Sequence, residues 1–182
     1  MELIGLYLVG CALLVLAGVA KVFRPDDTAR ALSAVIPLPL ARTRPLVRAG
    51  AIAEAALGAV ALIYPRTATA GLVALSYAAF AVFVLVARAK GGAIANCGCF
   101  GTPDTPATVL HVLINLGLLV AGVVVAATGP SGTIVSILST QPLHGLPLVL
   151  VSALCVWLSL LAISVLGGLQ AVRHLVGVTF RS

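Results

Sequence analysis

Apolar residues occur in long runs that are separated by short clusters of charged residues, prolines and glycines. A transmembrane helix needs about 20 mostly apolar residues, so runs of that length predict membrane spans. Such runs cover about residues 3–23, 49–64, 68–87, 107–127 and 146–172. The pattern therefore predicts an all-α membrane protein with five spans in one bundle.

The first apolar run could also be a secretory signal, since residues 18–20 resemble a cleavage site of small residues. A secretory signal has basic residues before its apolar stretch, whereas Glu2 stands at that position here. We therefore expect the first run to be retained as a membrane span.

Composition supports a membrane protein and excludes a soluble fold. The chain is 61% apolar and 9% charged, with a mean hydropathy of +1.19, whereas soluble chains are roughly 45–50% apolar and 25% charged. The net charge of +6 could suggest nucleic-acid binding. Most of the basic residues lie beside apolar runs, however, and aromatic residues make up only 5% of the chain. We therefore expect a lipid bilayer, and no nucleic acid, as the environment of this protein.

The basic residues also predict the orientation, because cytoplasmic loops of membrane proteins are enriched in lysine and arginine. With five spans, one set of alternating loops contains only Arg66. This distribution predicts an external N-terminus, a cytoplasmic C-terminus and a cytoplasmic loop between the third and fourth spans. The other set carries Lys21, Arg24, Arg30, Arg42, Arg44, Arg48, Arg88, Lys90, Arg173 and Arg181.

Four polar side chains interrupt the predicted spans, where each needs a partner or a function. Lys21 ends the first span, Glu54 lies about two turns into the second, and His111 and Asn115 lie one turn apart in the fourth. Antiparallel helices bring all four to one end of the bundle, and we expect Lys21 to pair with Glu54. Alternatively, Lys21 extends to the lipid headgroups, and His111 and Asn115 form hydrogen bonds between helices instead of handling protons.

Cys97 and Cys99 are separated by one glycine in the loop before the fourth span. A disulfide between residues so close is strained, and strained disulfides are easily reduced, as transfer disulfides are. Zinc or copper binding is an alternative, but the chain offers no convincing fourth ligand for a closed zinc site. A second alternative is that Cys97 and Cys99 are free cysteines that lie close in sequence by chance. Cys11 and Cys155 have matched depths and are either inert packing residues or a second, buried redox pair.

Several of these segments together resemble the MauE/DoxX-like family of small bacterial membrane proteins, named for methylamine utilisation. The resemblance lies in residues 17–21 (AGVAK), 49–58 (AGAIAEAALG) and 96–101 (NCGCFG), with His111 and Asn115. It covers roughly residues 1–128 and implies a DoxX-like core of four transmembrane helices. Residues 129–182 then add a loop, the fifth transmembrane helix and a short basic tail.

The resemblance implies a redox-associated protein of the bacterial cytoplasmic membrane that works with a thioredoxin-like partner of the MauD type. In the methylamine system this pair is thought to support disulfide formation in an extracytoplasmic client. Cys97 and Cys99 would be the redox pair of a thiol-disulfide oxidoreductase, and Lys21, Glu54, His111 and Asn115 would form a polar cluster beneath them. This role places the cysteine loop outside, whereas the charge distribution predicts a cytoplasmic loop.

Three function classes follow from these residues. In the first, an enzyme exchanges disulfides at Cys97 and Cys99 and passes electrons to a membrane carrier, for which a quinone is the available acceptor. In the second, the same loop is a scaffold that docks redox proteins without turnover. In the third, Lys21, Glu54 and His111 line the path of a small-solute carrier, for which homo-oligomerisation could supply the missing helices.

Overall fold

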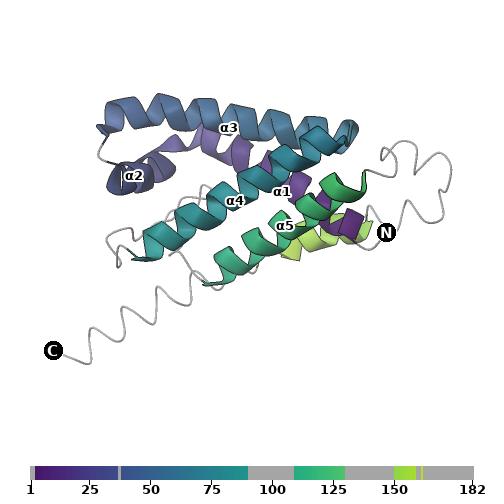
Figure 1. Ribbon diagram of the computed structural model, residues 1–182. Helices are drawn as coiled ribbons and strands as arrows, with labels where there is room; N and C mark the ends of the chain where they lie inside the picture. Colours follow the sequence, from purple (N-terminus) through teal and green to yellow (C-terminus); the bar gives the residue numbers. More distant parts are fainter. Residues whose placement is uncertain (1–2, 37, 90–108, 130–149, 159–160, 162–182) are drawn as a thin grey trace.

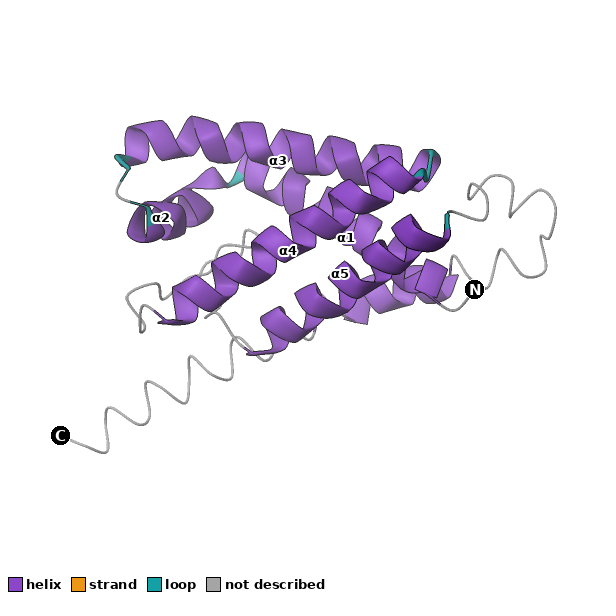
Figure 2. Cartoon of the chain, in the orientation of Figure 1, coloured by secondary structure: helices purple, strands orange, loops and turns teal. Residues whose placement is uncertain are grey.

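The computed structural model of the protein describes residues 3–36, 38–89, 109–129, 150–158 and 161, and within them all regular secondary structure is helical (Figure 2). Antiparallel helices cross one another in a bundle, and a shorter helix lies at one end (Figure 1). In chain order the helices are α1 (Leu3–Phe23), α2 (Pro25–Val35), α3 (Leu40–Ile63), α4 (Thr67–Ala89) and α5 (Val109–Thr128).

Four of these helices, α1, α3, α4 and α5, are long and apolar enough to cross a membrane. They correspond to the first four predicted spans, so the prediction of an all-helical membrane protein with a four-helix core is confirmed. Of the fifth predicted span, the structure describes residues 150–158 and 161 as helical. The rest of that span lies outside the described residues, and the fifth span remains a prediction.

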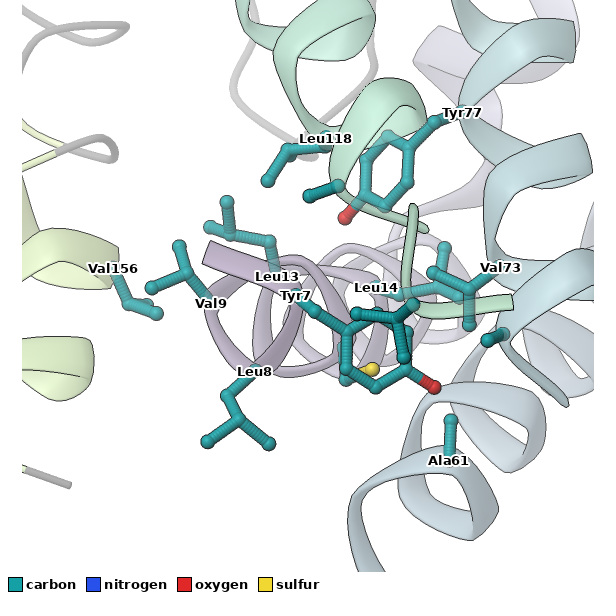
Figure 3. Close-up of a cluster of buried hydrophobic side chains, with 14 residues drawn as sticks. Tyr7, Leu8, Val9, Leu13, Leu14, Ala61, Val73, Tyr77, Leu118 and Val156 are labelled. Atoms are coloured by element: carbon teal, nitrogen blue, oxygen red, sulfur yellow. The ribbon is translucent and has the colours of Figure 1, made fainter. Parts of the chain in front are cut away.

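Helix α1 is the central helix of the bundle and packs against both α3 and α5. Half of its most apolar stretch is buried, compared with 22% for α3. Its side chains Tyr7, Leu13 and Leu14 meet residues of α4 and α5 in the main hydrophobic core (Figure 3). Large apolar side chains such as Ile52 and Leu113 point outward and are exposed. Lipid would cover them in a membrane, because the bilayer interior is as apolar as these side chains.

Small residues set the distances between the helices. A Cβ atom at Gly18 of α1 would lie 2.6 Å from the carbonyl oxygen of Ala51 in α3, and one at Gly58 would lie 2.7 Å from that of Cys11. Both distances are shorter than any normal contact, so only glycine permits the observed crossing of α1 and α3. Close approach through small residues is the usual mode of helix packing in membranes, where no hydrophobic effect drives helices together.

Helix α2 and the first turns of α3 form a polar layer at one end of the bundle that the hydrophobic pattern did not predict. Asp26 of α2 pairs with Arg44 of α3 at 2.6 Å, and the hydroxyl groups of Ser33 and Thr43 lie 2.7 Å apart. The sequence prediction started the second span after Arg48, but the helix already begins at Leu40. The prediction was wrong on this point because hydropathy detects the apolar part of a helix, whereas contacts with α2 stabilise its polar extension.

The end of the bundle that carries α2 also carries the end of α4 and the start of α5. Ala31 of α2 packs with Ala87 near the end of α4, and Val84 of α4 packs with Val112 of α5. Residues 90–108, which include Cys97 and Cys99, connect these two helices in sequence and lie outside the described residues.

Candidate functional site

A buried ion pair joins α1 to α3. The ammonium group of Lys21 lies 2.5 Å from the Oε2 atom of Glu54, and their side chains are 7% and 21% exposed. The structure therefore contains the pair that the sequence predicts and does not show Lys21 extended towards the end of the span. Because Glu54 lies well inside α3, the pair is an internal contact of the bundle.

The close crossing of α1 and α3 brings this pair together. Gly18 sits against the backbone of Ala51 and Ala55, and Lys21 follows Gly18 by three residues, on the same side of α1. Side chains in a helix lean towards its N-terminus, so the long side chain of Lys21 returns to the level of the crossing. Glu54 lies at that level, one turn after Ala51 on the same side of α3.

Two aromatic residues of α4 complete the surroundings of Lys21. Its ammonium group lies 4.6 Å from the centre of the Phe80 ring, within the range of a cation–π interaction. The Phe80 ring meets the Tyr77 ring edge to face, with centroids 5.8 Å apart and an interplanar angle of 83°. The Tyr77 hydroxyl donates a hydrogen bond of 2.6 Å to the backbone carbonyl of Gly10 in α1. Tyr77 and Phe80 therefore connect α4 to α1, the helix that carries Lys21.

Sequence analysis missed Tyr77 and Phe80, although a weak signal was present. They are spaced by three residues and so share one side of a helix that consists mostly of alanine, valine and leucine. The same spacing is common in helices whose aromatic residues only fill a core. The spacing therefore does not indicate that the Phe80 ring contacts the ammonium group of Lys21.

His111 and Asn115 lie in α5 and face the same region. His111, in the first turn, is 3% exposed, and the Asn115 side-chain amide donates a hydrogen bond of 2.7 Å to the His111 backbone carbonyl. This bond lies within α5, so it is not the hydrogen bond between helices that the sequence offered as an alternative for Asn115.

Lys21, Tyr77, His111 and Asn115 line a small cavity with a volume of about 30 Å³. Glu54 adjoins it through its ion pair with Lys21. The cavity thus collects residues from α1, α4 and α5 that are far apart in the sequence, near the end of the bundle where α4 stops and α5 starts. Its lining residues are Leu13, Leu14, Ala17, Lys21, Tyr77, Phe80, His111 and Asn115.

The cysteines have different environments. Cys97 and Cys99 lie outside the described residues. Cys11 is buried and Cys155 is exposed, and the structure shows no disulfide between them. Within the described parts of the chain, no group of three or more histidine, cysteine, aspartate or glutamate residues is arranged to hold a metal ion.

Comparison with known proteins identifies the family. No curated protein and no solved structure gives a significant match to the chain. The family described as methylamine utilisation protein MauE matches residues 2–128. This match includes the whole four-helix core, from the start of α1 to the end of α5, and covers more than half of the 182 residues. The chain, with its four membrane-spanning helices around a buried Lys21–Glu54 pair, therefore belongs to the MauE family.

Proposed function

We propose that this protein is a thiol-disulfide redox protein of the bacterial cytoplasmic membrane, in which Cys97 and Cys99 exchange a disulfide with a thioredoxin-like partner. The observation that carries the proposal is the convergence of Lys21, Glu54 and His111 at the end of the bundle to which the cysteine segment is connected. Membership of the MauE family supports the same reading. Ionisable groups inside a membrane are costly, and they are usually retained for a function.

The exchange needs two thiols and no further cofactor. The thiolate of one cysteine attacks a sulfur of the partner's disulfide and forms a mixed disulfide, while the other partner sulfur leaves as a thiolate. The second cysteine then displaces the partner, so two electrons pass from this protein to the partner, whose thiolates take up the protons. The reverse sequence oxidises the partner instead, which is the direction that would support disulfide formation in a client.

Lys21, Glu54, His111 and Asn115 serve this chemistry as a supporting cluster at the end of the bundle from which the cysteine segment follows in sequence. A nearby cation stabilises a thiolate and so makes a thiol more reactive. The charge of Lys21 is balanced by Glu54 at 2.5 Å, which leaves His111 as the group best suited to take up and return a thiol proton. Substitutions in the ion pair should therefore act mainly through the stability of the bundle, and substitution of His111 through the exchange rate.

A protein that oxidises its partner repeatedly must pass the electrons on, and in a bilayer a quinone can accept two electrons and two protons. The described cavity does not suit a quinone ring. Its volume is about 30 Å³, whereas a cavity that accepts benzene measures roughly 150 Å³. A quinone would therefore react at another surface of the protein. The same volume argues against a solute carrier that uses this cavity as its binding site.

Serine substitution tests the proposal. Each single variant, Cys97→Ser or Cys99→Ser, keeps one thiol and lacks the second thiol that would release a mixed disulfide. In cells, the variant that keeps the attacking cysteine should therefore accumulate a covalent complex with its partner. The complex should disappear on reduction and in the Cys97→Ser/Cys99→Ser double variant. Cys155→Ser, which removes an exposed cysteine outside the Cys97–Cys99 loop, is the matched control. A double variant that still supports full disulfide formation in the client would show that the protein is a scaffold and would overturn the proposal.

Labelling determines the side of the membrane on which the loop acts. A membrane-impermeant maleimide should modify Cys97 or Cys99 in intact cells if the loop is external, as a role in maturing extracytoplasmic clients requires. Labelling only after permeabilisation would place the loop in the cytoplasm, as the distribution of basic residues predicts. In that case the partner would be a cytoplasmic thioredoxin-like protein.

A further inference from the structure

The cavity between α1, α4 and α5 combines a buried charge with hydrogen-bonding groups that have unused capacity. A lysine ammonium group has three N–H donors. For Lys21 the described residues supply one carboxylate oxygen, from Glu54, and the face of the Phe80 ring. At least one N–H donor therefore remains for the cavity that Lys21 lines.

Asn115 provides a second polar wall. Its amide has two N–H donors and one carbonyl acceptor, and the hydrogen bond described for it uses one donor, on the His111 carbonyl. The Asn115 carbonyl oxygen and the second donor are thus not used by the hydrogen bond described for Asn115, which lines the same cavity as Lys21. His111 also lines the cavity and is itself almost fully buried.

The volume limits what this site can bind. A cavity needs roughly 10–15 Å³ to hold one water molecule, and a buried water needs two to four polar partners. At about 30 Å³, the cavity has room for one or two waters. The donors of Lys21 and the amide of Asn115 supply the partners, and His111 also lines the cavity.

We propose that this cavity is a water-binding site, in which one or two water molecules connect the Lys21 ammonium group to Asn115 and His111. The bound water completes the hydrogen bonding of a cation that the bundle has removed from bulk solvent. It also places a shared polar partner between residues of α1 and α5. The site does not depend on thiol chemistry, so it can be tested separately from the proposed function.

Solid-state NMR on the full-length protein in liposomes provides the test. Lys21 and Lys90 are the lysines of the chain, so Lys90→Gln with ¹⁵N-lysine leaves one side-chain signal, that of Lys21. We expect magnetisation to pass from water to the Lys21 Nζ atom much faster than to the backbone amide of Val73, which is buried and does not line the cavity. Transfer as slow as at Val73 would show that the cavity is dry and would overturn the proposal.

A variant that fills the cavity shows whether the water is inside it. Ala17 lines the cavity and is 6% exposed. Ala17→Val should reduce the transfer to Lys21 at least about fivefold, because the added methyl groups occupy the space of the water. Ala56→Val, at an exposed position of α3, should leave it unchanged. Unreduced transfer in Ala17→Val would mean that water reaches Lys21 from the Glu54 side, which also contradicts the proposal.

Asn115→Leu provides a second test if Ala17→Val does not fold. It keeps nearly the same side-chain volume but removes the polar partners on α5. We expect slower transfer to Lys21 in a protein that elutes normally on gel filtration. Transfer at the wild-type rate would show that Asn115 holds no water and would overturn the assignment of the site.

Discussion

Removal of one member of the Lys21–Glu54 pair should destabilise the bundle far more than removal of both. Glu54→Leu would leave a buried ammonium group with no carboxylate, and breaking a buried pair in this way costs about 3–5 kcal/mol. We expect about 3 kcal/mol, the lower end of that range, because the Glu54 side chain is 21% exposed and Phe80 still faces the ammonium group. This corresponds to a change of roughly 150-fold in the folding equilibrium.

The double variant separates electrostatics from packing. Lys21→Met/Glu54→Leu replaces both charges with apolar side chains of similar length, a change that is often neutral or stabilising for buried pairs. The free energy of unfolding of the double variant should therefore lie close to that of the wild type. Lys21→Met alone should cost less than Glu54→Leu alone, because the carboxylate that it leaves without a partner is 21% exposed, whereas the ammonium group left by Glu54→Leu belongs to a side chain that is 7% exposed.

Reversible unfolding of the purified protein in mixed detergent micelles, followed by tryptophan fluorescence or circular dichroism, measures these differences. Arg30 and Asp27 form a matched control on α2, since they also pair at 2.5 Å but the Arg30 side chain is 64% exposed. Their coupling energy should stay below about 1 kcal/mol. A Lys21–Glu54 coupling energy as small as that of the control would refute the argument that burial makes this pair a structural contact.

Two further substitutions test the helix crossings by the same measurement. Gly58→Ala should cost about 1–3 kcal/mol, because its Cβ atom would lie 2.7 Å from the backbone of Cys11. Gly50→Ala, which meets nothing within 4 Å, should be neutral or slightly stabilising, and equal effects at both glycines would contradict the close crossing. Tyr77→Phe removes the hydrogen bond to Gly10 and should cost about 1 kcal/mol. Tyr64→Phe, at a position that is 62% exposed, should have little effect, and an equal loss there would count against the assigned role of Tyr77.

Some features of this protein can be predicted from its sequence because they depend on local composition. Lipid accepts only segments that satisfy their own backbone hydrogen bonds, so the length of an apolar run is enough to predict each of α1, α3, α4 and α5. The same cost of polar groups in lipid made Lys21 and Glu54 stand out as partners, and the structure contains that pair. The family resemblance also rested on short motifs that can be read directly from the chain.

Other features depend on contacts between distant segments. Helix α2 and the polar start of α3 have no apolar run, and they are stabilised by contacts such as Asp26 with Arg44. Phe80 gave no sequence signal for binding a cation, because its role depends on the tertiary contact with Lys21 of α1. The cavity that joins Lys21 to His111 is a space between three helices, so no single segment encodes it.

The sequence alone determined that this is a membrane protein and which four segments form its core. It also determined which two charged residues, Lys21 and Glu54, pair inside the bundle. Each of these follows from the free energy of transferring a residue from water to lipid, which is a property of that residue and its neighbours in the chain. The tertiary structure decided how closely the helices approach, through Gly18 and Gly58. That distance sets which side chains meet around Lys21, because contacts across a bundle depend on backbone geometry that neighbours in sequence do not share.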